Sequence, residues 1–258
     1  MTTAFRAVDP GIGDTNKLPV FVINLDRRSD RRKAMFAQLD RLGCDAVRIR
    51  ATDAHEVCDM IPRRRRMTSQ QIACRESHHA AIGAFLRTGA PLALILEDDA
   101  ELSPRVRGLL ESADWWPART NAVRLSSRRE DKPLLLGSTI GETPDGRAIR
   151  PIAWSCSGAE AYMLNRAGAK IVLDAAPTIA MPMDSALFHK INSPIARLLK
   201  STQVVPGMTR HPDDGDSDNS GQNLARATGP GLRASYKAGI ALRRLSGRVS
   251  RMHCPWQP

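Results

Sequence analysis

The chain has 258 residues, 42% of them hydrophobic, and its 38 Lys and Arg outnumber its 27 Asp and Glu to give a formal net charge of +11. Its longest apolar stretches fall far short of the roughly 20 residues that span a bilayer, and its opening segment lacks the basic start and apolar centre of a signal peptide. We therefore expect a cytoplasmic protein built around one large α/β domain.

The N-terminal part reads as a leader followed by a β-α-β unit. Residues 1–17 show no hydrophobic periodicity and are expected to form a flexible leader. An apolar strand over residues 19–25, a helix over 29–42 with apolar residues at helical spacing, and a strand over 46–50 follow in that order. This succession is typical of nucleotide-binding α/β domains.

The same patterns place further elements up to residue 190. Thr68 is a candidate helix N-cap, and Gly89 marks the end of that helix. The turn signals over 131–164 predict a small antiparallel β patch beside the parallel sheet. The remaining predicted elements are a strand over 92–96, a helix over 106–112, a strand over 121–125, and helices over 166–173 and 184–190.

The domain is expected to span residues 18–210, followed by two C-terminal segments. Residues 211–230 are polar and Gly-rich and predict a loop. Residues 231–258 predict a basic amphipathic helix with arginines in the gaps of an apolar stripe. The helix either lies on an acidic membrane surface, as a peripheral protein on the cytoplasmic face would, or docks its stripe on the domain. The stripe comprises Leu232, Tyr236, Ile240, Leu245, Val249 and Met252.

The excess of positive charge raises the question of a polyanionic partner. Only 4% of the residues are aromatic, and none are interleaved with the arginine runs as in a platform for single-stranded nucleic acid, so we expect no nucleic-acid partner. The four arginines at 63–66 and the Arg-rich C-terminus suit anionic lipid or a phosphorylated acceptor, or form a solvated surface.

The five cysteines are scattered and include no Cys-x-x-Cys pair, which favours reduced thiols over disulfides. The pairs His55 with Cys58 and Cys74 with His78 have the spacing of zinc ligands. The alternative is that Cys74 is a small buried helix residue.

An apolar run ends in three consecutive acids, Glu97, Asp98 and Asp99. Adjacent carboxylates repel one another unless a metal or a basic partner offsets their charge, and oxygen ligands suit Mg²⁺ or Mn²⁺. Because side chains alternate along a strand, Glu97 and Asp99 can converge on one ion while Asp98 points elsewhere. The alternative is a solvated strand end that precedes a helix.

Other polar residues also follow predicted strands. Ligands of open α/β sheets bind beyond the carboxyl ends of the strands, so we expect Asn24 and Asp53 at the same edge as the three acids, where they can bind a nucleotide. Asp53 either binds a base or ribose or caps a turn. Arg27 and Arg31 follow the first strand and can contact a diphosphate, although Arg31 equally suits an exposed ion pair.

Four blocks of the chain resemble glycosyltransferase family 25, the lipopolysaccharide and collagen sugar-transferase family. They lie over residues 20–32, 72–78, 94–100 and 158–184, and the last contains Gly158, Tyr162, Gly168 with Ala169, and Pro182 with Asp184. The resemblance implies a GT-A-like α/β fold: a mostly parallel nucleotide-binding sheet flanked by helices with a small antiparallel patch. It also implies a nucleotide-sugar donor and, usually, a divalent metal.

The resemblance also implies roles for residues. Asp99 is the first candidate for the metal and Glu97 the second, whereas Asp98 is a candidate for the donor ribose. His211, which lies beyond the four blocks, is a further candidate for the metal shell. His78 contacts the donor phosphate, orients a carboxylate or is a structural histidine.

Direct inversion at the anomeric carbon needs a carboxylate that takes the proton of the acceptor hydroxyl. Asp184 is the candidate base, although it equally suits a helix N-cap, and Glu160 is the reserve. The expected function is a metal-dependent hexosyltransferase that moves a sugar such as galactose from a UDP-sugar to a lipopolysaccharide-type or other glycan acceptor. The alternative is a non-catalytic member of the fold that binds a glycan or a membrane.

Overall fold

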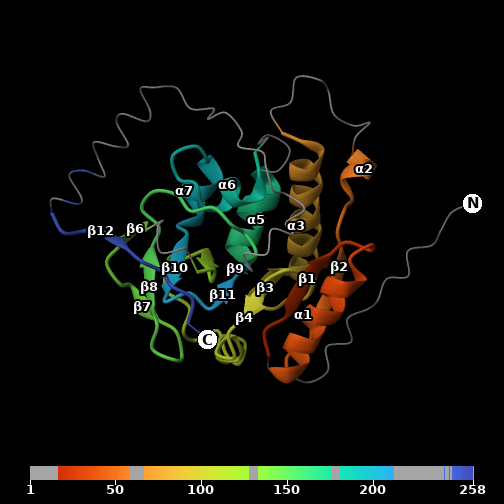
Figure 1. Cartoon of the computed structure of the whole chain (residues 1–258). Coiled ribbons are helices and arrows are strands. Elements are labelled where there is room, and N and C mark those ends of the chain that lie inside the picture. Colours follow the sequence, from red (N-terminus) through yellow and green to blue (C-terminus); the bar gives the residue numbers. More distant parts are fainter. Residues whose placement is uncertain are drawn as a thin grey trace, which may run out of the picture.

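The computed structural model describes residues 17–57, 67–127, 133–175, 181–211, 241, 244 and 246–257. Within this part the chain builds a central eight-stranded sheet in the order β2-β1-β3-β9-β5-β10-β8-β7, flanked by helices on both faces (Figure 1). The predicted leader up to residue 16, the arginine run at 63–66 and the predicted loop from residue 212 onward lie outside the described residues.

The N-terminal β-α-β unit is confirmed. It consists of β1 (Val20–Asn24), α1 (Ser29–Arg41) and β2 (Val47–Arg50). The strand β1 is buried along its whole length and pairs in parallel with β2 on one side and with β3 (Leu92–Glu97) on the other. A central parallel strand covered on both faces needs such a continuous apolar run.

The helix α3 (Ser69–Arg87) begins where the sequence predicts. Thr68 and Gln71 form a capping box, in which each side chain accepts a hydrogen bond from the backbone N–H of the other residue. The short helix α2 (Ala54–Val57) precedes α3, which packs against β1, β2 and β3. Through this packing, His78 of α3 lies beside Glu97 at the carboxyl end of β3.

One strand of the predicted antiparallel patch lies inside the main sheet rather than beside it. The strand β9 (Ala161–Asn165) runs antiparallel between β3 and β5 (Ala122–Arg124). Residues 161–164 are all buried, as a strand covered on both faces requires. Beyond β5, β10 (Thr202–Val205) continues in parallel, and β8 (Ala148–Pro151) and β7 (Gly141–Glu142) close the edge in antiparallel pairing.

The remaining elements form two small sheets and several short helices. The strand β4 (Glu101–Leu102) pairs with β11 (Thr209–Arg210), and β6 (Leu134–Gly137) pairs with β12 (Val249–Met252). The helices are α4 (Val106–Leu109), α5 (Arg166–Ala175), α6 (Met183–Phe188) and α7 (Pro194–Leu199). The mixed α/β class with a mostly parallel sheet and small antiparallel pairs is therefore confirmed.

Successive side chains of β3 point to opposite faces of the sheet and pack into two apolar layers. Ala93 and Ile95 belong to the apolar layer that includes residues of α3, α5, α6 and α7, whereas Leu94 and Leu96 belong to the layer that includes residues of α1 and α4. Both layers consist of buried side chains, so β3 is packed on both of its faces.

The predicted C-terminal helix over 231–258 is wrong for its last part. Positions 241 and 244 are helical, but Val249–Met252 is the strand β12, and Val249 is buried rather than available to a lipid surface. The four residues of this segment carry no strand alternation of their own, and it is their antiparallel pairing with β6 that makes them a strand. Among the described residues, no helix has the length and apolar character to cross a membrane.

Candidate functional site

The carboxyl ends of β1, β2 and β3 meet because these strands are parallel and in register. Ile23 pairs with Glu97 and Asn24 pairs with Arg50, so the residues that follow the strands share one edge of the sheet. The expected convergence of Asn24 with the acids of β3 is thus present in the structure.

Asn24 is buried, and its side-chain amide makes three hydrogen bonds within the protein. Its Nδ2 donates to Asp98 Oδ2 over 2.6 Å and to the carbonyl of Arg28 over 2.9 Å, and its Oδ1 accepts from Arg48 Nε over 3.0 Å. Both amide hydrogens therefore have acceptors within the protein. Asn24 positions Asp98 in this arrangement, and a donor nucleotide that accepts a hydrogen bond from Asn24 Nδ2 would have to displace one of these two acceptors.

The three acids do not continue the strand alternation. The strand ends at Glu97, and Asp98 and Asp99 lie in a turn in which the Ala100 N–H donates to the Glu97 carbonyl over 3.3 Å. Both aspartates approach the same guanidinium, since Arg31 Nη1 lies 3.5 Å from Asp98 Oδ1 and 3.0 Å from Asp99 Oδ2. The turn thus pairs Asp99 with Asp98 rather than with Glu97, because alternation applies only inside a strand.

Arg31 is nine-tenths buried rather than on an exposed helix face, with 12% of its side chain accessible. Its charge offsets the repulsion between the two aspartates. Burial raises the pKa of Asp98 despite the hydrogen bond from Asn24. Burial acts in the same direction on Asp99, but the hydrogen bond and charge of His211 and the charge of Arg31 outweigh it and lower the pKa of Asp99.

His211 contacts the acids although it lies 112 positions after Asp99 in the chain. The pairing of β11 with β4 sets Arg210 opposite Glu101, which brings His211 Nε2 to 3.1 Å from Asp99 Oδ2. The other carboxylate oxygen, Asp99 Oδ1, is buried and has no hydrogen-bond partner. An orphaned carboxylate oxygen beside an imidazole is a donor set that accommodates a divalent cation.

His78 lies in a buried chain of three polar side chains. Its Nδ1 is 2.9 Å from the Tyr162 hydroxyl, and its Nε2 is 3.2 Å from Glu97 Oε1. The imidazole is fully buried. Of the predicted roles, this contact fits the orientation of a carboxylate. Desolvation raises the pKa of Glu97, and the hydrogen bond from His78 opposes that rise.

Cys74 lies one helical turn before His78 on α3. The thiol, the imidazole and the Glu97 carboxylate each offer a ligand atom, and these atoms lie within 4.8 Å of one another. Of the pairs with zinc-ligand spacing, Cys58 falls outside the described residues and His55 is exposed. Of the two predicted pairs, the structure therefore shows a cluster only for Cys74 and His78. The third member of this cluster is the carboxylate of Glu97, which comes from β3.

Arg27 and Asp53 form an ion pair at the same edge of the sheet, with Arg27 Nε 3.2 Å from Asp53 Oδ2. Asp53 Oδ1 also accepts from the His55 N–H at 3.1 Å, so this residue caps the turn into α2, as one of the two predicted roles requires. Half of the Arg27 side chain is exposed, which leaves it accessible to a bound anion.

The two candidate bases differ in their surroundings. Asp184 is half-buried and accepts from the N–H groups of Ser185, at 2.6 Å, and Gly158, at 3.4 Å, while the N-cap of α6 is Pro182 rather than Asp184. Glu160 is buried, and its Oε1 lies 3.7 Å from Arg124 Nη2. Asp184 is therefore the more accessible of the two.

Sequence reasoning missed the roles of two residues of this network. Tyr162 and Arg48 contact the predicted site residues, but these contacts join residues far apart in the chain. For Cys74 a signal was present, since spacing of four residues to His78 puts both side chains on one helix face.

Comparison with known proteins identifies the family. The model described as Glycosyltransferase family 25 (LPS biosynthesis protein) matches residues 17–187. The chain belongs to glycosyltransferase family 25. The family 25 match runs from β1 into α6 and includes every site residue described above except His211.

Two relatives named "Glycosyltransferase 25 family member", from Anopheles gambiae and Aedes aegypti, are each 30% identical over 113 residues. The aligned region covers 36% of this family 25 chain and 19% of each relative, so the chain spans about a fifth of their length. The chain is also similar to a solved glycosyltransferase involved in the glycosylation of the major capsid of PBCV-1, with a TM-score of 0.39 and 8% identity over 87% of this chain and 99% of the other.

Proposed function

We propose that the protein is a metal-dependent glycosyltransferase that moves a hexose, such as galactose, from a UDP-sugar to a lipopolysaccharide-type or other glycan acceptor. The observation that carries this proposal is the meeting of Asp98, Asp99, Arg31 and His211 at the carboxyl ends of parallel strands in a family 25 chain. Nucleotide ligands of open α/β sheets bind at this position.

A divalent cation, Mn²⁺ or Mg²⁺, fits the residues present. Asp99 offers a buried oxygen without a partner, and His211 offers a ring nitrogen beside it. Glu97 is the second candidate ligand, but its Oε1 is bonded to His78 in this structure, so we place the donor cation at Asp99 and His211 without it. When bound, the cation would offset the negative charge that develops on the departing diphosphate.

The basic residues at this edge support binding of the anionic donor. Arg27 is half exposed beside the end of β1, and Arg31 carries the charge that holds Asp98 and Asp99 together. Arg27 is suited to contact a diphosphate directly. Arg31 keeps the aspartates ordered before the donor arrives, which reduces the entropy lost on binding.

Asp184 is suited to act as the general base toward an acceptor hydroxyl. Hydrogen bonds from the backbone N–H groups of Ser185 and Gly158 hold its carboxyl group in place. Inversion at the anomeric carbon follows if the hydroxyl attacks directly while Asp184 takes its proton.

We also propose that the reaction takes place in the cytoplasm. The described cysteines Cys44, Cys74, Cys156 and Cys254 are free thiols, which is usual in a reducing compartment.

The test is a screen of nucleotide sugars in the presence of Mn²⁺. Two quantities are measured for each sugar: the shift in the melting temperature of the protein and the slow release of free sugar from the donor. We expect stabilisation and hydrolysis with a UDP-hexose, and neither when Mn²⁺ is replaced by chelator. Stabilisation without any release of sugar, with every acceptor tried, would favour a non-catalytic glycan-binding protein. A lack of response to every nucleotide sugar would contradict the proposal.

A further inference from the structure

We propose that Cys74, His78 and Glu97 form a second metal site, which takes a transition-metal ion such as Zn²⁺. This site is separate from the cation proposed at Asp99, and it does not depend on the proposed transfer reaction. The juxtaposition of a thiol, an imidazole and a carboxylate from two different elements carries the inference.

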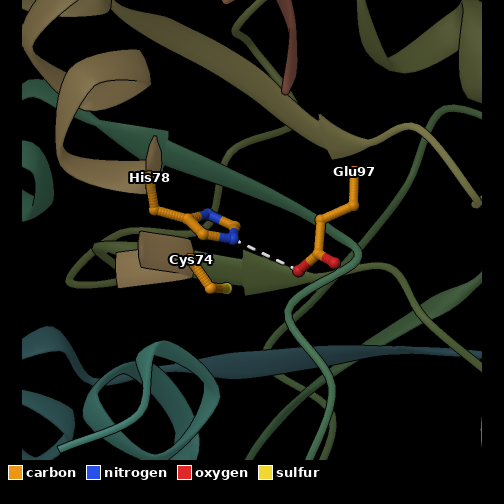
Figure 2. A group of neighbouring side chains, drawn as sticks. All are labelled: Cys74, His78 and Glu97. Carbon is orange, nitrogen blue, oxygen red and sulfur yellow. Dashed lines mark hydrogen bonds and ion pairs between the residues drawn. The ribbon is translucent and has the colours of Figure 1, made fainter. Parts of the chain in front are cut away.

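The fold brings the three side chains to one point. Cys74 and His78 lie four residues apart on α3, so their side chains share one face of the helix. Glu97 is the last residue of β3, against which α3 packs. Figure 2 shows the sulfur and the carboxylate on the same side of the imidazole, with His78 Nε2 3.2 Å from Glu97 Oε1.

The separations fit a shared ion. The three ligand atoms lie within 4.8 Å of one another, so a single ion between them needs only small side-chain movements to reach ordinary bond lengths of about 2.0–2.3 Å. Three protein ligands with one open position are the usual arrangement of an accessible zinc site.

The donor atoms select the class of metal. Mg²⁺ and Ca²⁺ prefer oxygen ligands, whereas a thiolate and an imidazole favour Zn²⁺ and related transition metals. A thiolate and a carboxylate also neutralise the two positive charges of such an ion. The oxygen-rich pair Asp98 and Asp99 therefore suits a different ion from the one that suits Cys74 and His78.

A neighbouring hydroxyl orients the imidazole. His78 Nδ1 is 2.9 Å from the buried Tyr162 hydroxyl, which fixes the ring so that Nε2 faces Cys74 and Glu97. Histidine ligands of metals commonly hold their second nitrogen in such a hydrogen bond. Cys74 and Glu97 are partly exposed, so an ion can enter from their side.

A metal at this position would join α3 to the end of β3. Because Asp98 and Asp99 follow Glu97 directly, the ion would fix the start of the turn that carries them. Binding to the folded state alone would also raise the stability of the domain by mass action.

The test is titration of the full chain with Co²⁺ after removal of bound metal by a chelator. Co²⁺ bound to a thiolate gives a charge-transfer absorption in the near ultraviolet that oxygen and nitrogen ligands do not give. We expect this band in the wild type and its loss in Cys74→Ser. The matched controls Cys44→Ser and Cys58→Ser should retain it. Absence of the band in the wild type, its retention in Cys74→Ser or its loss in Cys58→Ser would overturn the proposal.

A second measurement covers the case in which Cys74→Ser does not fold. Zn²⁺ should protect Cys74 of the wild-type chain from alkylation, as measured by peptide mass spectrometry, and equal labelling of Cys74 with and without Zn²⁺ would contradict the site. Asp99→Asn, which removes the cation proposed for the donor, should keep the cobalt band. The two metal proposals can therefore fail independently.

Discussion

Asn24 at the end of β1 donates a 2.6 Å hydrogen bond to Asp98, although 74 positions separate the two residues in the chain. This bond ties the first strand to the acidic turn after β3. The turn is thus ordered from two sides, by Asn24 and by Arg31, before any ligand is bound.

Asn24→Ala should loosen this turn. The change removes the side-chain hydrogen bonds to Asp98 and Arg48, at a cost of about 1–3 kcal/mol in the free energy of unfolding. We also expect weaker binding of UDP, because Asp98 is then held by Arg31 and no longer by Asn24. Urea unfolding and calorimetric titration with UDP measure the two effects.

Asn165→Ala is the matched control. Asn165 is hydrogen-bonded through both ends of its amide at the opposite end of the sheet, where it pairs with Leu92. This variant should lose stability but bind UDP as the wild type does, corrected for the folded fraction. Equal UDP affinity in both variants would show that Asn24 has only a structural role.

Gly158→Ala should destabilise the domain through two separate effects. Gly158 has a φ of +90°, and an added Cβ would overlap Glu160 Oε2 and lie 3.0 Å from Arg124 Nη2. The backbone strain alone costs about 1–2 kcal/mol. Gly146 has a φ of +81° and open space around its Cβ position, so Gly146→Ala carries the strain without the contact.

We expect Gly158→Ala to lower the urea midpoint more than Gly146→Ala does. The difference between the two measures the close packing of Gly158 against Glu160 and Arg124. Equal midpoints would mean that these side chains move aside without cost.

Asp184→Asn separates catalysis from donor binding. A general base acts on the acceptor, so the variant should bind the UDP-sugar normally and lose transfer by about 10²-fold or more. Glu160→Gln is the companion variant, since that carboxylate is buried beside Arg124 and should affect stability before turnover. If Asp184→Asn turns over at the wild-type rate, the base must be sought elsewhere.

Deletion of the chain from residue 246 onward should destabilise the domain. The strand β12 pairs with β6, Cys254 is buried, and the Gly207 N–H donates to the Pro255 carbonyl over 2.9 Å. We expect a lower melting temperature together with loss of β-sheet signal in circular dichroism. An unchanged melting temperature would contradict a stabilising contact between this segment and the domain.

Local sequence patterns predict the β-α-β unit, the Thr68 cap and the strand over residues 92–96, because each depends on neighbouring residues alone. They also predict that Asn24 and the three acids lie at one edge of the sheet, because the carboxyl ends of parallel strands share that edge. The partners of Glu97 could not be foreseen, because the strand ends there and the side chain turns to His78. The strand β12 was missed because its pairing with β6 is a long-range contact.

The contact of His211 with Asp99 is another long-range effect. It depends on the two-residue pairing of β11 with β4, which spans more than one hundred positions and has no hydrophobic pattern of its own. The sequence suggested His211 as a ligand but gave no reason for its placement, and the structure supplies the strand that carries it there.

The central claim is that a divalent cation at Asp99 links the protein to a nucleotide diphosphate, and calorimetric titration of UDP with and without Mn²⁺ tests it most directly. We predict that the wild type binds UDP only with Mn²⁺, and that Asp99→Asn remains folded but loses most of this binding. The exposed-site control Asp40→Asn should behave as the wild type. Equal UDP affinity in the presence of chelator, or full Mn²⁺-dependent binding by Asp99→Asn, would contradict the account.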